Sequence, residues 1–389
     1  MILLRLKGDK NMYQIVQKEK NKSNFLNYLY FNKSISIPTS AKDLGITYPT
    51  AKKIVDDLIK DNLIIKLDEK FSSGGRGQSV FLLNENLLFS IGIQIEKGKI
   101  SFILINILGK ILKEKTIVNA FFNQENFLKY LIDEFSIFYE EIDMVDKINI
   151  LGVGVSFPGI VNNEEHKIVN GINLKLKEIN LKPLEEKFDL NFYLENEANV
   201  SIYSEKILGI GQELGDFIVI SIASGIGAGI FLNSKIFRGN SGIAGEVGHI
   251  CIEPNGEQCN CGNIGCWELY ASESALLKNA EKILGQNFSL EELFSIENEE
   301  ISILIEKYIK YLGIGIRNIL FSLNINSIIL SGSISVYLEK YDSLLKTILT
   351  KNEFFSQNDI KIHYSNLNKR SNSLGAAFIP ISKYFSLVE

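Results

Sequence analysis

All four cysteines of the chain and one of its three histidines lie between Gly245 and Glu268. The imidazole and the thiolates of three of these cysteines are the donor set of a closed tetrahedral zinc site. Gly and Asn are frequent in the loop between them, which lets a short backbone turn around a small ion. We therefore predict one structural Zn²⁺ per chain, rather than ordinary buried residues or half of a disulfide pair. The predicted ligands are His249, Cys259, Cys261 and Cys266.

Other residues of this stretch have different expected roles. Cys251 lies in the apolar run ICIE and is predicted to be an ordinary small buried residue. Glu246 and Glu268 place a carboxylate at either end of the loop.

Length and composition indicate a globular protein. A chain of 389 residues with 46% hydrophobic content is long enough for two or three domains with a substantial core. The start MILLRLKGDK is too short and too quickly charged for a signal sequence, and no apolar run reaches the ~18 residues of a membrane span. Together with the four cysteines, this predicts a cytoplasmic protein without membrane insertion.

Charge is distributed unevenly along the chain. Residues 1–80 hold 14 Lys and Arg against 8 Asp and Glu, whereas the remaining 309 residues hold 27 against 38. A basic head on an acidic body indicates that the head meets an anion.

The basic head has the spacing of a helix-turn-helix. A first helix is predicted over residues 22–31, and a short second helix begins near Pro38 and stops at Gly45. Thr47 is a plausible N-cap for the third helix, and Pro49 lies in its first turn, where a missing N–H is tolerated. Its predicted buried stripe is Ile54, Val55 and Leu58.

The outer face of the third helix would then face DNA, since known helix-turn-helix domains place this part near base edges. Residues 63–67 and 80–83 read as two strands joined by a wing whose Arg76 could reach a phosphate or the minor groove. The alternative is a helical hairpin that only makes a dimer contact. The candidate DNA-binding residues are Tyr48, Thr50, Ala51, Lys52, Lys53 and Arg76.

The body contains the same strand pattern twice. Residues 91–115 alternate as three antiparallel strands with turns at Lys97-Gly98 and at 106–110, and residues 217–237 repeat the design. This predicts an internally duplicated fold with two lobes and a cleft between them. The turn SGIGAG (224–229) is either a backbone cradle for an oxygen-rich ligand or a tight hairpin turn. Further predicted strands are 150–159, 192–199 and 327–333, and further helices are 127–141, 272–284, 290–296, 301–323 and 374–384.

These motifs together resemble the ROK family, the group of repressors, open reading frames and sugar kinases. GEVGH followed by C-x-C-G-x-x-G-C-x-E is similar to the signature of that family, and the basic head resembles its repressor branch. The other matching motifs are PGIV (158–161), GINL (171–174), ENEAN (195–199), SGIGAGIFLNSKIFRGNSGIAGE (224–246) and LGAA (374–377).

The resemblance implies an α/β fold of the duplicated actin-like or ribonuclease H-like two-lobed sugar-kinase type, preceded by a winged helix-turn-helix domain. It implies a DNA-binding domain at 1–84 and a ROK domain at 85–389. Within the ROK domain, the expected parts are lobe one at about 85–200 plus a C-terminal helix at 372–389, and lobe two at about 201–371 with the zinc loop at 249–266.

The residues that family kinases use for phosphoryl transfer are altered here. Where the kinases have an aspartate followed by Gly-Gly-Thr, this chain has Gln94, Glu96, Lys97 and Gly98, and Glu96 would repel a polyphosphate. Two other nucleotide segments read Ala223-Ser224 and SGS (331–333). Glu197 stands where the kinases carry an aspartate as base, one methylene shorter, and displacement of ~1 Å costs about 100-fold. We expect phosphorylation to be lost, with Glu197 a vestigial base.

The sugar-binding residues implied by the resemblance are retained. Their side chains suit hydrogen bonds to hydroxyl groups, and a missing partner costs about 1–3 kcal/mol. If one nitrogen of His249 binds the metal, the other is held toward the sugar. The expected sugar ligands are Asn173, Asn196, Glu197, Glu246, His249 and Glu268.

The sequence thus predicts a sugar-responsive transcriptional repressor of carbohydrate uptake or catabolism genes. Its expected partners are operator DNA, a sugar or sugar-phosphate effector and further copies of the chain in a homodimer or homotetramer. One alternative is an ATP-dependent sugar kinase, similar to glucokinase or N-acetylhexosamine kinase, with a regulatory head. Another is a regulator switched by a sugar-transporter protein.

Overall fold

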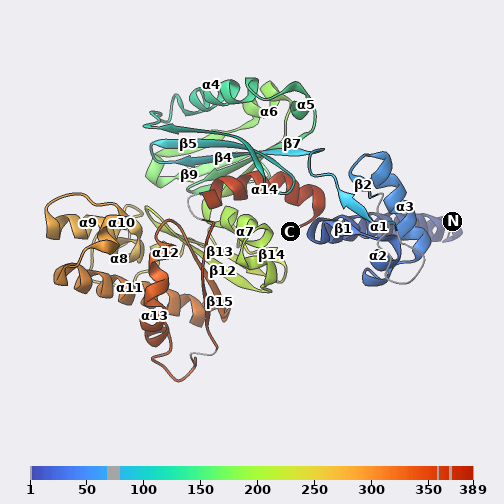
Figure 1. Ribbon diagram of the computed structural model, residues 1–389. Coiled ribbons are helices and arrows are strands. Elements are labelled where there is room, and N and C mark those ends of the chain that lie inside the picture. Colours follow the sequence, from blue (N-terminus) through green and yellow to red (C-terminus); the bar gives the residue numbers. More distant parts are fainter. Residues whose placement is uncertain (1, 68–78, 357–358, 368–369, 389) are drawn as a thin grey trace.

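The computed structural model describes residues 2–67, 79–356, 359–367 and 370–388. The N-terminal head lies at one end of the molecule, and the two lobes of the body lie beside each other (Figure 1). The head ends with strand β3, whose last residue is Leu83, and the body begins with strand β4, whose first residue is Phe89.

The head combines helices with a small antiparallel sheet of order β1-β3-β2. The first helix begins much earlier than predicted, and β1 was not predicted. The two strands predicted around the wing are present and pair with each other, Ile64 opposite Leu83. The loop between them, including Arg76, lies outside the described residues. The bounds are α1 Ile2–Asn32, β1 Ser34–Ile35, α2 Ile37–Asp43, α3 Tyr48–Lys60, β2 Ile64–Lys66 and β3 Phe81–Leu83.

The helix signals of the head are confirmed, with one correction. Thr47 caps α3 by accepting a hydrogen bond from the Thr50 backbone N–H. Val55 and Leu58 are buried as predicted, whereas Ile54 is only half-buried. Ala51 is also fully buried and was wrongly placed on the outer face. Ala51 lies four residues before Val55 and seven before Leu58, which puts all three on one face of a helix.

The two lobes contain sheets with the same topology, as the repeated strand pattern predicted. In lobe one the order is β11-β7-β4-β5-β6, and in lobe two it is β14-β13-β12-β15-β16. Each sheet has three consecutive antiparallel strands, with two later strands added in parallel beside the first. The bounds are β4 Phe89–Glu96, β5 Lys99–Asn106, β6 Ile111–Val118, β7 Ile150–Phe157, β11 Phe192–Asn196, β12 Phe217–Ile222, β13 Ile226–Leu232, β14 Lys235–Ile236, β15 Ser327–Ser331 and β16 Lys361–Tyr364.

Helices and a second small sheet complete the body. The sheet has the order β10-β9-β8 and lies in lobe one (β8 Ile160–Asn162, β9 Lys167–Gly171, β10 Leu176–Asn180). The helices are α4 Phe127–Glu140, α5 Met144–Lys147, α6 Lys182–Phe188, α7 Glu197–Ile207, α8 Glu268–Ala271, α9 Glu273–Leu284, α10 Leu290–Ser295, α11 Glu299–Leu323, α12 Ser335–Leu338, α13 Asp342–Leu349 and α14 Ser371–Phe385.

Two predictions about the body were wrong. The strand predicted over 192–199 ends at Asn196, because the Asn196 side chain accepts a hydrogen bond from the Ala198 backbone N–H and so caps α7. Cys251 is exposed rather than buried. It forms an isolated β-bridge with Cys266, and it is Cys266 whose side chain is buried.

Helix α14 packs between the two lobes, against β4 and β7 on one side and α7 on the other (Figure 1). The backbones approach closely because three contact positions are glycine. A methyl group at Gly92, Gly154 or Gly375 would overlap a carbonyl oxygen of the neighbouring element. The position of α14 therefore depends on these missing side chains.

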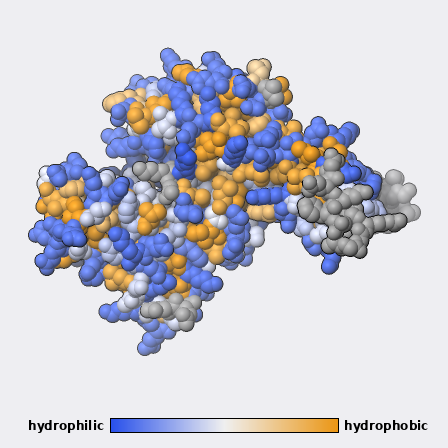
Figure 2. All heavy atoms as spheres, viewed as in Figure 1, coloured by the Kyte–Doolittle hydropathy of each residue, from blue (hydrophilic) through white to orange (hydrophobic). Residues whose placement is uncertain are grey.

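The far end of α14 packs against the head. The ring of Phe385 lies 5.1 Å from that of Tyr30, and the Tyr30 hydroxyl donates to the Ile107 carbonyl oxygen at 2.7 Å. Hydrophobic residues follow the junction of head and body (Figure 2). Head and lobe one therefore share one hydrophobic cluster. Within the described residues, none of the helices combines the length and apolar character needed to span a membrane.

Substituting Gly154 tests the close packing of α14. We expect Gly154→Ala to lower the free energy of unfolding by about 3 kcal/mol, because the added methyl group overlaps the backbone of α14 at Ala376. Urea denaturation measures this change. Gly215→Ala is the control, since a methyl group there meets no neighbouring atom. Equal stability of the two variants would contradict the packing argument.

Candidate functional site

The predicted metal ligands lie together on the loop that follows β14. Their ligand atoms all lie within 4.8 Å of one another. Cys259 Sγ is 3.7 Å from His249 Nδ1, and Cys261 Sγ is 3.6 Å from Cys266 Sγ. One imidazole and three thiols at these separations fit a tetrahedral metal site, so this His/Cys cluster could hold a metal ion.

The fold of the loop brings these side chains together. His249 ends the 3₁₀ turn Val247–His249, and the loop then folds back so that Cys251 bridges with Cys266. Gly265 has a φ of +71°, and a side chain there would overlap the Glu253 carbonyl. The next residue after the cluster, Trp267, is fully buried and donates to the Tyr311 carbonyl of α11 at 2.9 Å. The loop is therefore attached firmly to lobe two.

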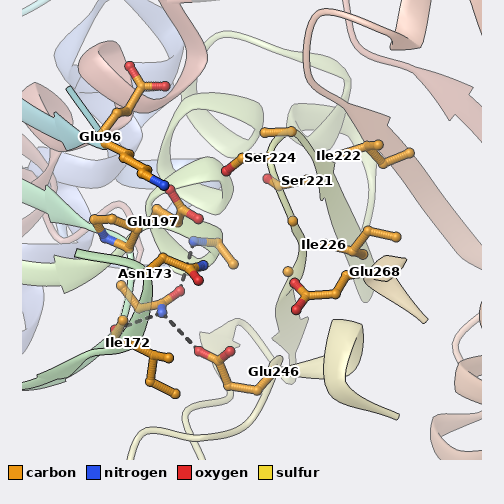
Figure 3. Close-up of a pocket in the computed structure, with 18 of the residues that line it drawn as sticks. Glu96, Ile172, Asn173, Glu197, Ser221, Ile222, Ser224, Ile226, Glu246 and Glu268 are labelled. Atoms are coloured by element: carbon orange, nitrogen blue, oxygen red, sulfur yellow. Dashed lines mark hydrogen bonds between the residues drawn. The ribbon is translucent and has the colours of Figure 1, made fainter. Parts of the chain in front are cut away.

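A cavity of about 720 Å³ lies between the lobes, next to the metal loop. Glu197 and Asn173 lie on one side of it, and Glu268 lies opposite (Figure 3). All six side chains predicted to bind sugar line this interlobe cavity: Asn173, Asn196, Glu197, Glu246, His249 and Glu268.

Hydrogen bonds already connect some of these side chains. Asn196 Nδ2 donates to the Gly159 carbonyl at 2.9 Å and to Glu246 Oε1 at 3.3 Å (Figure 3). His249 has Nδ1 on the side of Cys259 and Glu268, whereas its Nε2 lies 3.9 Å from Glu246 Oε2. The imidazole thus links the metal cluster to the cavity.

Burial raises the pKa of two of the carboxyl groups. The pKa of Glu197 rises to about 7, mainly through burial and further through the nearby charges of Glu96 and Glu246. Burial is also the main cause of the raised pKa of Glu246. Near neutral pH, part of the population therefore has Glu197 protonated, and its carboxyl can then donate as well as accept hydrogen bonds.

The other half of the cavity holds the altered phosphate-loop residues. The turn between β4 and β5 is Lys97-Gly98, as predicted, and Gly98 has a φ of +73°. Glu96 lines the cavity (Figure 3). Its carboxylate forms an ion pair of 2.6 Å with Lys99. The cavity thus has a carboxylate on this side that is already paired with an ammonium group, and Lys97 and Lys99 line it as well.

The Gly-rich turn after β12 fits both of its predicted roles. It closes a hairpin, with the Ala223 N–H donating to the Gly225 carbonyl, and it also lines the cavity. One lining residue nearby was not predicted as part of a site: Glu273, whose carboxylate accepts a hydrogen bond from Ser333 of the SGS segment. Glu273 begins α9 shortly after the expected sugar ligand Glu268, and only the folded structure shows that it faces the same cavity.

Most of the candidate DNA-binding residues lie on the outer face of α3. Tyr48 is 51% exposed, and Lys52 and Lys53 are exposed as well. Thr50 is half-buried, and Lys52 pairs with Asp56 at 3.0 Å. The buried Ala51 does not belong to this surface.

The raised pKa of Glu197 predicts a pH-dependent stability. The stabilisation linked to this proton is present below about pH 4.5 and is lost as the pH rises through about 7, because the folded chain binds the proton more tightly than the unfolded chain. The variant Glu197→Gln has no carboxyl group at this position, so its stability does not fall in this pH range for this reason. Between about pH 4.5 and about pH 8, we expect the variant to gain about 3 kcal/mol of unfolding free energy relative to wild type.

Urea denaturation at several pH values, followed by the fluorescence of the single tryptophan, measures this difference. Glu213→Gln, at an exposed carboxyl, is the control. A pH-independent difference between wild type and Glu197→Gln would contradict the raised pKa.

Comparison with known proteins places this site in a family. Residues 90–383 match the ROK family. The chain is 32% identical over 384 residues to the xylose repressor of Bacillus spizizenii, which covers 97% of this chain and 98% of that protein. A solved ROK family transcriptional regulator, described as a homolog of the E. coli MLC protein, has a TM-score of 0.80 at 23% identity and covers 94% of this chain and 97% of that one.

A ROK family glucokinase from Streptomyces griseus, solved with glucose and AMPPNP, has a TM-score of 0.65 at 23% identity. The structural match covers 74% of this chain and 98% of the kinase. The similarity to the xylose repressor extends over nearly the whole chain, whereas the family match begins at Ser90, after the head. The chain belongs to the ROK family, and its fold is the one shared by a transcriptional regulator and a sugar kinase of that family.

Proposed function

We propose that this chain is a sugar-responsive transcriptional repressor that controls genes of carbohydrate uptake or catabolism. The observation that carries the proposal is one cavity in which all six expected sugar ligands meet beside the metal loop, in a chain that also has a helix-turn-helix head. The similarity to a xylose repressor over nearly the whole chain supports the same function.

The effector is a neutral sugar, and xylose is the first candidate because of that relative. The part of the cavity around Asn173 and Asn196 also contains three carboxyl groups, from Glu197, Glu246 and Glu268. Such a surface suits hydroxyl groups and disfavours a sugar phosphate, whose charge would be repelled. Paired hydrogen bonds from fixed side chains would distinguish sugars that differ in one hydroxyl.

Sugar kinase activity is not part of the proposed function. Positioning and charge stabilisation account for most of the catalysis of phosphoryl transfer. Here Glu96 occupies the phosphate side of the cavity, and the Ser333–Glu273 hydrogen bond adds a second carboxyl group to that half. Glu197 retains a position at the start of α7 and lines the cavity, where it would serve as a sugar ligand.

The metal that we propose for the His/Cys cluster is Zn²⁺, one per chain and structural. Cys259, Cys261, Cys266 and His249 would hold it, because three thiolates and one imidazole match its preferred ligands. The ion would fix the orientation of the His249 ring. Its Nε2, on the cavity side, would then be positioned for a sugar hydroxyl.

The head would bind operator DNA through the outer face of α3, with Tyr48, Thr50, Lys52 and Lys53, and through Arg76 of the wing. Two heads in a homodimer would read half-sites ~34 Å apart or a multiple of this distance. The same function is compatible with a homotetramer instead of a homodimer. It is also compatible with a sugar-transporter protein as a further partner. Since a repressor acts on DNA, its compartment is the cytoplasm.

Sugar-dependent release of DNA tests the proposed function. We expect the full chain to bind DNA upstream of its own operon at moderate salt and to release it with xylose, with Lys53→Ala weakening binding to all sequences. An electrophoretic mobility assay measures both effects. Absence of specific binding would contradict the repressor function. ATP-dependent turnover of a sugar, abolished by Glu197→Gln, would support a kinase instead.

Metal content tests the His/Cys cluster. Native mass spectrometry should show about one Zn²⁺ per chain, and Cys261→Ser should lose the ion, because three ligands hold it much less tightly. Cys251→Ser is the matched control, since this exposed thiol lies outside the cluster. Retention of the ion by Cys261→Ser would contradict the proposed ligand set.

A further inference from the structure

The loop from Arg238 to Glu246 reaches the interlobe cavity through Ile243 and Glu246. It follows β14 of lobe two and ends at the sugar-site residue Glu246. Ile243 in this loop lines the cavity and is 50% exposed. Gly239, Gly242 and Gly245 all have positive φ values, of +68°, +72° and +100°. A loop with three such glycines has many accessible conformations, so contacts at its ends must select one.

At its first end, the loop is joined to lobe one by an ion pair. Both Nε and Nη2 of Arg238 donate to Glu195 Oε2, at 3.0 and 2.8 Å. Glu195 is the next-to-last residue of strand β11 in lobe one and is only 3% exposed. Arg238 Nη2 also lies 3.3 Å from the Tyr203 hydroxyl. A lysine has a single ammonium group and would not reproduce this two-donor arrangement.

The same carboxylate also holds the start of α7. Glu195 Oε1 accepts hydrogen bonds from the Asn196 backbone N–H and from Asn199 Nδ2, both at 3.0 Å. Asn163 Nδ2, on the turn between β8 and β9, lies 3.4 Å from Oε2. One buried carboxylate thus contacts β11, α7, the β8–β9 turn and the loop that begins at Arg238.

At its other end, the loop is joined to Asn196, the residue that follows Glu195 in lobe one. Glu246 accepts from Asn196 Nδ2 at 3.3 Å, and the Gly245 carbonyl accepts from the Ala228 N–H of β13 at 2.7 Å. Two consecutive residues, Glu195 and Asn196, therefore hold the two ends of the same loop. Asn196 also lines the cavity, whereas Glu195 and Arg238 do not.

We propose that Arg238 and Glu195 are positioning residues for sugar binding: their ion pair fixes the loop from Arg238 to Glu246 across the cleft and so keeps Glu246 and Asn196 in place for the ligand. The inference rests on the proposed function, because it concerns the affinity of the same cavity. Without the ion pair, the glycines let the loop leave the cleft, and the sugar must first order it again. Affinity for the sugar falls as a result.

Xylose titration of the full chain by calorimetry tests this role. Arg238→Ala should raise the Kd for xylose by about tenfold or more, which is the usual effect of removing a group that orients a ligand-binding residue. Arg238→Lys should recover part of the affinity, because it restores the charge but only one donor group. The control is Arg317→Ala, which removes another half-buried arginine in lobe two, away from the cavity.

The zinc content and the melting temperature of the Arg238 variants, both measured without sugar, show whether the ion pair positions the ligand site or only stabilises the fold. A positioning role predicts a weakened Kd for xylose in Arg238→Ala with the zinc content of wild type. A lower melting temperature with unchanged Kd in both Arg238 variants would overturn it, since the ion pair would then serve only stability. If wild type binds no xylose, the proposed effector fails and this inference fails with it. Wild-type binding with equal affinity in Arg238→Ala contradicts the inference alone.

Discussion

The close packing of α14 between the lobes is the constraint on which the body of this protein depends. Its backbone reaches β4, β7 and α7 at distances that only glycines at positions 92, 154 and 375 allow. Because α7 begins at Glu197, this packing also fixes one wall of the interlobe cavity. The other end of α14 contacts Tyr30 of the head. Helix α14 therefore contacts both α7, which starts at the interlobe cavity, and the N-terminal head.

The features that were predicted correctly are those marked by residues close together in the sequence. Turn residues such as Lys97-Gly98 mark strand ends directly, and the repetition of strands and turns predicted two sheets of equal topology. The cluster of His249 with three cysteines follows from ligand types at short spacing, which no distant residue has to complete. The six expected sugar ligands meet in one cavity, but this expectation came from a family resemblance rather than from spacing.

Features set by distant contacts were missed. Ala51 is compatible with either face of a helix, and only packing inside the head buries it. Cys251 has apolar neighbours in the sequence, yet its side chain is exposed in the folded loop. The ion pair between the buried Glu195 and the half-buried Arg238 joins residues more than forty positions apart, so their spacing in the sequence does not predict it. Pairings of this kind become visible only when the chain is folded.

The hydrogen bond between Asn196 and Glu246 has a consequence for ligand recognition. Before any sugar enters, both N–H groups of the Asn196 amide are already bonded, to the Gly159 carbonyl and to Glu246, while its oxygen accepts from Ala198 N–H. A sugar hydroxyl that accepts from this amide nitrogen must exchange with an existing protein partner, so the count of hydrogen bonds changes little. The free energy gained per hydroxyl is then small, while a misplaced hydroxyl leaves two groups unpaired. Such a site is better suited to rejecting the wrong sugar than to holding the right one tightly, which is the property of a sensor that must empty again when the sugar is used up.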